Sequence, residues 1–174
     1  MRRPLLAILL AAVLILSPTA STGGTPQGSV PAAAQLAARE PWRWPAPPPM
    51  QIVEPYVAPP HRYGPGHRGV DVAAEVGAEV VAPADGTVAF VGTVVDRPLI
   101  TIDHGDGLVS TLEPVSSDLT AGDRVLRGQA VGRVATGGHT AHGALHIGAR
   151  LHGEYVNPLL LLGNVPRAVL LPCC

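Results

Sequence analysis

The stretch EVVAPADGTVAFVGTVVDRPLITIDHGDGLVSTL, residues 79–112, decides the fold. Short runs of β-branched and apolar residues alternate there with the turn sequences PADG at 83–86 and DHGDG at 103–107. Such runs, separated by glycine- and proline-containing turns, are typical of all-β domains. The pattern continues from residue 51 to residue 163 and predicts strands at residues 79–81, 87–95, 99–103, 108–112, 130–134 and 145–151. We therefore expect an all-β protein, a single compact antiparallel β-sheet core domain, with no long helical period after the first twenty residues.

Residues 1–20 have the form of a secretory signal peptide. Arg2 and Arg3 form a positively charged start, residues 5–16 are an unbroken apolar run, and small residues follow at 17–20. Twelve residues of helix rise about 18 Å, well short of the roughly 30 Å hydrocarbon core of a bilayer. The sequence therefore predicts a secreted, extracellular protein without a stable membrane span in the mature chain.

Composition changes mark the remaining boundaries. Residues 21–50 are rich in proline and alanine and predict a linker and an entry strap, in which Trp42 and Trp44 would pack the strap onto the domain. Residues 51–163 form the predicted domain, and residues 164–174 form a C-terminal tail. Cys173 and Cys174 are the chain's two cysteines, and because they are adjacent they cannot close a long loop, so the fold is not a disulfide scaffold.

The charge balance excludes whole classes of function. The chain has 12 basic and 13 acidic residues, a formal net charge of -1 and only 3% aromatic residues. This composition lacks the basic surface and the stacking platforms of a nucleic-acid-binding protein. All the basic residues are arginines, so no activity can use a lysine amine.

The histidines are the strongest indication in the sequence of a metal-binding or catalytic site. His61, His104 and His152 lie among loop residues without a nearby set of partners, so we interpret them as solvated or backbone-bonded side chains.

Two other segments hold histidines in phase with further ligand-type residues. The segment GHRGVDV at 66–72 places His67 and Asp71 four residues apart, and GHTAHGALHIG at 138–148 does the same for His142 and His146. Even spacing in an extended chain places side chains on one face. Three nitrogen or oxygen ligands with an open fourth position are the arrangement of catalytic zinc. The alternatives are a hydrogen-bonded His–Asp pair and two unrelated histidine-rich turns.

These segments resemble the lysostaphin/LytM-type zinc metallopeptidases, which cut peptide cross-links in bacterial cell walls. The resemblance spans residues 42–162 and is carried by GHRGVD at 66–71, VAPADGTV at 81–88, LTAGDRVLRGQAVG at 119–132, LH at 145–146 and YVNPL at 155–159. It implies a Zn²⁺ held by His67, Asp71 and His146, and peptide stems of peptidoglycan as the substrate.

The sequence departs from this family at two helper histidines. In the family these histidines assist activation of the nucleophilic water and stabilise the charge that develops during the reaction. Their positions fall on Ala144 and Pro114. His142 is the nearest substitute and our catalytic candidate, whereas strand alternation would turn Glu113 away from the face that Pro114 occupies. Each lost helper costs about 10²–10⁴ in rate.

Two competing functions follow from the same residues. Segments 82–88 and 121–129 also resemble the lipoyl-type β-sandwiches that carry biotin or lipoate, but those cofactors attach to a lysine and the chain has none. The second alternative is a catalytically impaired module that binds peptidoglycan or activates a partner cell-wall amidase. We expect a zinc metalloendopeptidase-like protein, with this module as the alternative.

Overall fold

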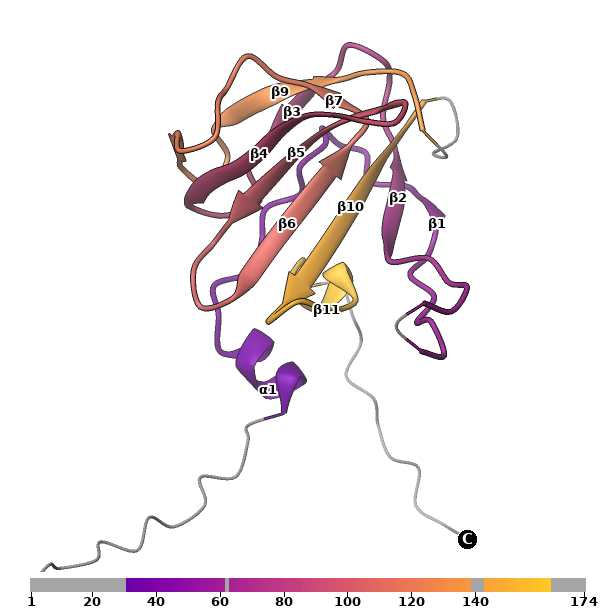
Figure 1. The fold of residues 1–174 in the computed structure, drawn as a ribbon, viewed down its shortest axis with the longest axis vertical. Helices are drawn as coiled ribbons and strands as arrows, with labels where there is room; N and C mark the ends of the chain where they lie inside the picture. The colour runs from indigo at the N-terminus through magenta and orange to yellow at the C-terminus, as the bar shows by residue number, and fades with distance from the viewer. Residues whose placement is uncertain (1–30, 62, 139–142, 164–174) are drawn as a thin grey trace, which may run out of the picture.

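The computed structural model describes residues 31–61, 63–138 and 143–163, and these residues form an almost entirely β structure (Figure 1). The strands are β1 (Ile52–Glu54), β2 (Gly69–Ala73), β3 (Glu79–Val81), β4 (Gly86–Val94), β5 (Arg97–Asp103), β6 (Leu108–Glu113), β7 (Val115–Ser116), β8 (Arg124–Val125), β9 (Ala130–Val134), β10 (Ala144–Leu151) and β11 (Glu154–Tyr155). The helical elements described are α1 (Ala32–Ala37) and the 3-10 turn η1 (Pro158–Leu160). The prediction of an all-β, antiparallel fold is confirmed.

The strands belong to two antiparallel sheets. The larger has the order β1-β2-β10-β6-β5-β4-β8, with β11 paired to β10, and the smaller has the order β3-β9-β7. In Figure 1 the smaller sheet lies at the top of the molecule, above the long strands β6 and β10. The six strands predicted from sequence match β3, β4, β5, β6, β9 and β10, with end shifts of at most two residues.

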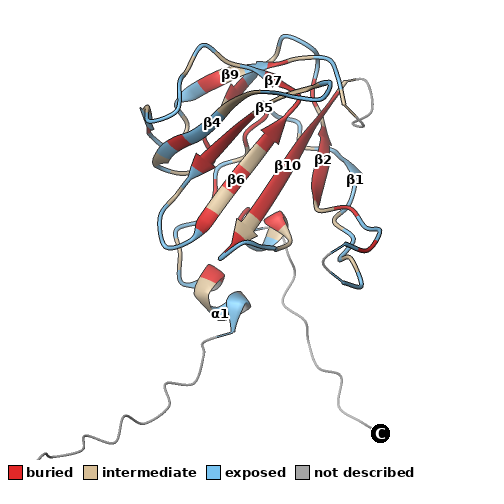
Figure 2. Cartoon of the chain, viewed as in Figure 1, coloured by how far each residue is buried: buried red, intermediate tan, exposed pale blue. Residues whose placement is uncertain are grey.

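The main core lies between the two sheets. Val70, Ile100 and Leu145 from the larger sheet and Val80 and Val131 from the smaller one are all at most 2% exposed. Burying one such side chain contributes about 1.5–3 kcal/mol. Figure 2 shows the consequence: β2, β10 and much of β6 are buried along their length, so a polar side chain on these strands needs a specific partner.

A second apolar cluster attaches the entry strap. Trp42 is 4% exposed in this cluster, and Trp44 packs against both clusters. The amide of Trp42 donates to the carbonyl of Leu161 at 2.7 Å. Leu36 joins the cluster from α1, a helix that we did not expect because six residues are too short for a recognisable helical period.

No helix within the described residues is long and apolar enough to cross a membrane. The predicted signal segment 1–20, the tail with Cys173 and Cys174, and the catalytic candidate His142 lie outside the described residues.

Candidate metal centre

Two neighbouring strands of the larger sheet bring the three predicted ligands together. Asp71 on β2 is the direct cross-strand partner of His146 on β10. His67 precedes β2 and forms an isolated bridge with Val57, in which each backbone amide donates to the other residue's carbonyl at 2.9 and 3.0 Å. Although four positions separate His67 and Asp71 in the chain, His67 Nε2 reaches to 3.0 Å from Asp71 Oδ1.

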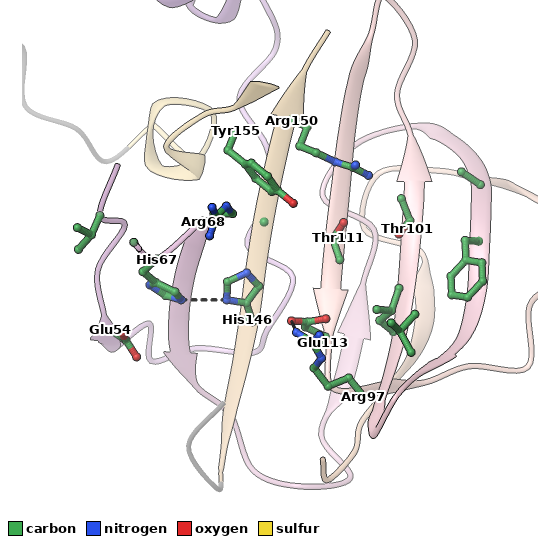
Figure 3. A pocket seen from close by; sticks show the side chains of 17 residues that line it. Glu54, His67, Arg68, Arg97, Thr101, Thr111, Glu113, His146, Arg150 and Tyr155 are labelled. Atoms are coloured by element: carbon green, nitrogen blue, oxygen red, sulfur yellow. Dashed lines mark hydrogen bonds and ion pairs between the residues drawn. The ribbon is translucent and has the colours of Figure 1, made fainter. Parts of the chain in front are cut away.

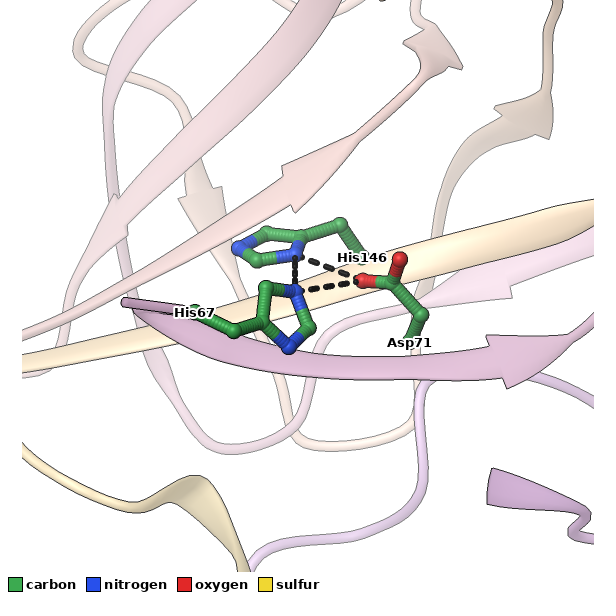
Figure 4. A group of neighbouring side chains, drawn as sticks. All are labelled: His67, Asp71 and His146. Carbon is green, nitrogen blue, oxygen red and sulfur yellow. Dashed lines mark hydrogen bonds and ion pairs between the residues drawn. The ribbon is translucent and has the colours of Figure 1, made fainter. Parts of the chain in front are cut away.

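The ligand-type atoms of these residues converge (Figure 4). Asp71 Oδ1 lies 2.7 Å from His146 Nδ1 and 3.0 Å from His67 Nε2, and the two ring nitrogens are 3.1 Å apart. Asp71 is 1% exposed and each histidine 7%. The structure therefore places both imidazoles on the same side of the sheet, around one buried carboxylate.

The hydrogen bond on the far side of the His67 ring fixes its tautomer. His67 Nδ1 lies 2.8 Å from the carbonyl oxygen of Pro55. Because a carbonyl only accepts, Nδ1 carries the hydrogen, and Nε2 of the neutral ring presents a lone pair to Asp71 and His146. One buried place thus holds the lone pair of His67 Nε2, the carboxylate oxygen of Asp71 and a ring nitrogen of His146. This arrangement is unfavourable unless a proton or a cation lies among them.

The spacing of the three atoms fits a small divalent cation. Ligands about 2.1 Å from one tetrahedral zinc lie about 3.4 Å apart. The three observed separations are 2.7–3.1 Å, so a slight spreading of the side chains provides the space. Among the described residues, His67, Asp71 and His146 form the one group of three such side chains that could hold a metal ion.

The absence of a side chain at Gly69 leaves space for the His146 ring. A Cβ at Gly69 would lie 2.5 Å from Cε1 and Nε2 of His146 and 2.5 Å from the carbonyl oxygen of Ile147. Gly148, directly opposite Gly69 in the β2–β10 register, has more space, since a Cβ there would come no closer than 3.5 Å to His146. The GHRGVD motif therefore needs glycine at position 69 because any larger residue would overlap the His146 ring.

The histidines open onto a pocket of about 890 Å³ on the outer face of the larger sheet (Figure 3). Glu113, 6% exposed, also lines this pocket, and it pairs across the strands with His146. Arg97 Nη1 lies 3.6 Å from Glu113 Oε1.

The expectation that Glu113 would face away from the site is wrong. We assumed that Pro114 would be the pocket-facing residue, but β6 ends at Glu113. Within β6, Thr111 and Glu113 line the pocket while Leu112 lies in the core. Alternation is therefore preserved, and its phase is set by the pairing of β6 with β10.

His104, which we set aside as a ligand, is a hydrogen-bonded side chain outside the group of candidate metal ligands. Its ring nitrogens lie 2.8 Å from the carbonyl oxygen of Asp85 and 2.8 Å from Ser110 Oγ. Burial lowers the pKa of His104 below its usual 6.5, against an opposing effect of the hydrogen bond to Asp85.

Comparison with known protein families gives one match for the domain. Residues 65–158, more than half of the chain, match the sequence profile of peptidase family M23. The matched range contains the three candidate ligands His67, Asp71 and His146, together with strands β2 and β10.

Individual relatives extend this comparison. An uncharacterised protein of Mycobacterium tuberculosis is 36% identical over 71% of this chain and 52% of its own length. The murein hydrolase activator NlpD of Salmonella dublin is 30% identical over 85% of this chain and 37% of its own. A crystal structure of a mutant catalytic domain of the M23 protein EnpA from Enterococcus faecalis superposes with a TM-score of 0.57 at 30% identity, covering 66% of this chain and 94% of that one. The chain thus spans about half or less of the length of these two full-length relatives.

Proposed function

The chain belongs to peptidase family M23, and we propose that it is a secreted zinc metalloendopeptidase that hydrolyses peptide cross-links of bacterial peptidoglycan. The observation that carries this proposal is the convergence of His67 Nε2, Asp71 Oδ1 and His146 Nδ1 at the wall of a large pocket. Export rests on the signal-like residues 1–20.

The three residues would hold the ion with one oxygen and two nitrogens and leave a position free. A zinc ion so held supplies Lewis acidity, polarising a carbonyl and lowering the pKa of water. The Pro55 carbonyl keeps His67 in the ligating tautomer through the 2.8 Å hydrogen bond to Nδ1. Because Asp71 is buried, its charge is little screened by solvent and favours occupation by a cation.

Glu113 supplies the proton-accepting group that the residues at 114 and 144 lack. Its carboxylate shares the pocket face with His146, and the nearby Arg97 guanidinium orients it. A carboxylate beside the scissile bond can take a proton from the attacking water and pass it to the leaving amine. His142 remains a second candidate for this role.

A second function is favoured by a specific observation. The family helper positions hold Ala144 and Pro114, neither of which can exchange a proton. The relative NlpD is described as an activator of murein hydrolases. A module that keeps the metal centre but has lost turnover would act by binding peptidoglycan peptides or by stimulating a partner amidase.

One experiment separates these functions. The purified chain is assayed for zinc content, for cleavage of peptidoglycan fragments, and for stimulation of a cell-wall amidase. Asp71→Asn removes the ligand charge, while Asp118→Asn changes an exposed carboxylate outside the pocket and serves as the matched control. Zinc-dependent cleavage lost only in Asp71→Asn supports the peptidase. Zinc without cleavage, combined with amidase stimulation, supports the activator, and the absence of zinc binding contradicts both.

A further inference from the structure

Basic side chains line the pocket beside the candidate metal site, although the chain as a whole has a small negative net charge. Three of the chain's twelve basic residues, Arg68, Arg97 and Arg150, line it, against the carboxylates of Glu54 and Glu113. Arg97 is matched by Glu113 at 3.6 Å. The other two arginines, Arg68 and Arg150, add further positive charge to the wall of this pocket.

Arg68 and Arg150 share one aromatic ring. Their Cζ atoms lie 5.5 and 6.0 Å from the ring centroid of Tyr155. Figure 3 shows Tyr155 between the two guanidinium groups at the end of the pocket away from Arg97. Two cations held near one ring repel each other, so a bound anion between them would relieve this repulsion.

The two guanidinium groups differ in their partners. Arg68 Nη2 donates to the carbonyl oxygen of Gly64 at 2.9 Å, which orients this side chain. Arg150 forms no ion pair with any described carboxylate, although Glu154 lines an adjoining hollow with both arginines. Arg150 therefore keeps its donor groups for a ligand.

We infer that Arg150 and Arg68, stacked against Tyr155, bind a free carboxylate of the peptide substrate. A guanidinium presents a planar pair of donors that matches a carboxylate, and it retains these in-plane donors when its face lies on an aromatic ring. The inference rests on the proposed peptide-hydrolysing function and names its substrate class: peptide stems that carry an unmodified carboxylate.

The position of the arginines relative to the metal centre limits where that carboxylate lies. His146 and Arg150 are four residues apart on β10 and line the same pocket. Four strand residues span about 13 Å, and an extended peptide advances about 3.3 Å per residue. The carboxylate thus belongs to a residue within about four positions of the bond at the metal centre.

The test measures binding, so it does not depend on turnover. The probe is a peptidoglycan stem peptide with free carboxylates, compared with the same peptide fully amidated, titrated into zinc-free and zinc-supplemented protein by calorimetry or NMR. A charge-assisted hydrogen-bonded pair predicts that amidation weakens binding about ten- to hundredfold. Arg150→Gln should abolish this preference and leave the affinity for the amide unchanged, with Arg150→Lys in between.

Arg124→Gln is the matched control because Arg124 is exposed on β8 and does not line the pocket. It should retain the preference for the acid. Equal binding of acid and amide by the native protein, or a preference that survives Arg150→Gln, would overturn the inference while leaving the proposed function intact. Inorganic phosphate binding as tightly as the acid peptide would also overturn it, by showing a general anion site. If neither peptide binds, the proposed function fails together with the inference.

Discussion

Replacing Gly69 by alanine should damage the domain in a way that Gly148→Ala does not. The two glycines face each other across β2 and β10, beside the His146 ring. A Cβ at Gly69 would lie 2.5 Å from the ring and 2.5 Å from a backbone oxygen of β10, whereas a Cβ at Gly148 would make ordinary contact at 3.5 Å. Both substitutions restrict the unfolded chain equally, a gain of about 0.4–1 kcal/mol. Overpacking costs about 1–3 kcal/mol and applies to Gly69 alone.

The difference in the free energy of unfolding between the two variants should therefore be about 1–3 kcal/mol, measured by urea denaturation of the zinc-free proteins. Because Gly69→Ala also displaces the His146 ring, zinc affinity should fall about 10–100-fold, the usual effect of losing a group that orients a ligand. Gly148→Ala should bind zinc as the native chain does. If the two variants unfold at the same urea concentration and bind zinc equally, our account of position 69 is wrong.

Three further predictions concern other parts of the structure. Glu113→Gln should lower peptide cleavage about 10²–10⁴-fold with unchanged zinc affinity, measured by turnover and zinc titration, and full activity would remove Glu113 from the mechanism. Trp42→Ala should lower the free energy of unfolding in urea by about 3–5 kcal/mol, because Trp42 is 4% exposed and its ring centroid lies 5.2 Å from that of His104. A loss below about 1 kcal/mol would show that the strap does not stabilise the domain. Burial keeps the pKa of His104 in the folded protein below its usual 6.5. Below pH 6.5 the unfolded chain therefore binds a proton that the folded protein does not. The free energy of unfolding should fall by at most about 1.4 kcal/mol per pH unit as the pH drops from 6.5 toward the pKa of His104 in the folded protein. This component should be absent in His104→Gln, and an unchanged pH slope in that variant would contradict it.

The longer strands could be predicted from sequence, and the shorter elements could not. β4, β5 and β10 have seven to nine residues each, enough for apolar runs and flanking turns to be recognised. β7, β8 and β11 have two residues each and exist because neighbouring strands offer backbone partners. Helix α1 was missed for the same reason, since Leu36 is held by tertiary packing and not by a helical pattern.

The three candidate ligands could be named from sequence because two short motifs resemble a zinc metallopeptidase family, whereas the rest of the pocket depends on strand register. This resemblance implies His67, Asp71 and His146 as a set, and the structure brings their side chains together. Glu113 was placed on the wrong face because the end of β6 cannot be located from sequence to within one residue. The approach of Arg68 and Arg150 to Tyr155 joins a loop and two strands, and no local pattern indicates it.

The most direct test of the metal centre is a competitive zinc titration of the purified chain and of Asp71→Asn against a chromogenic chelator. We predict one zinc bound per native chain and an affinity more than about 100-fold lower in Asp71→Asn. The reason is that the lost oxygen would be a direct ligand, because Asp71 Oδ1 lies 3.0 Å or less from both ring nitrogens. A native chain that binds no zinc, or a variant that binds it equally well, would contradict the assignment of His67, Asp71 and His146 as a metal centre.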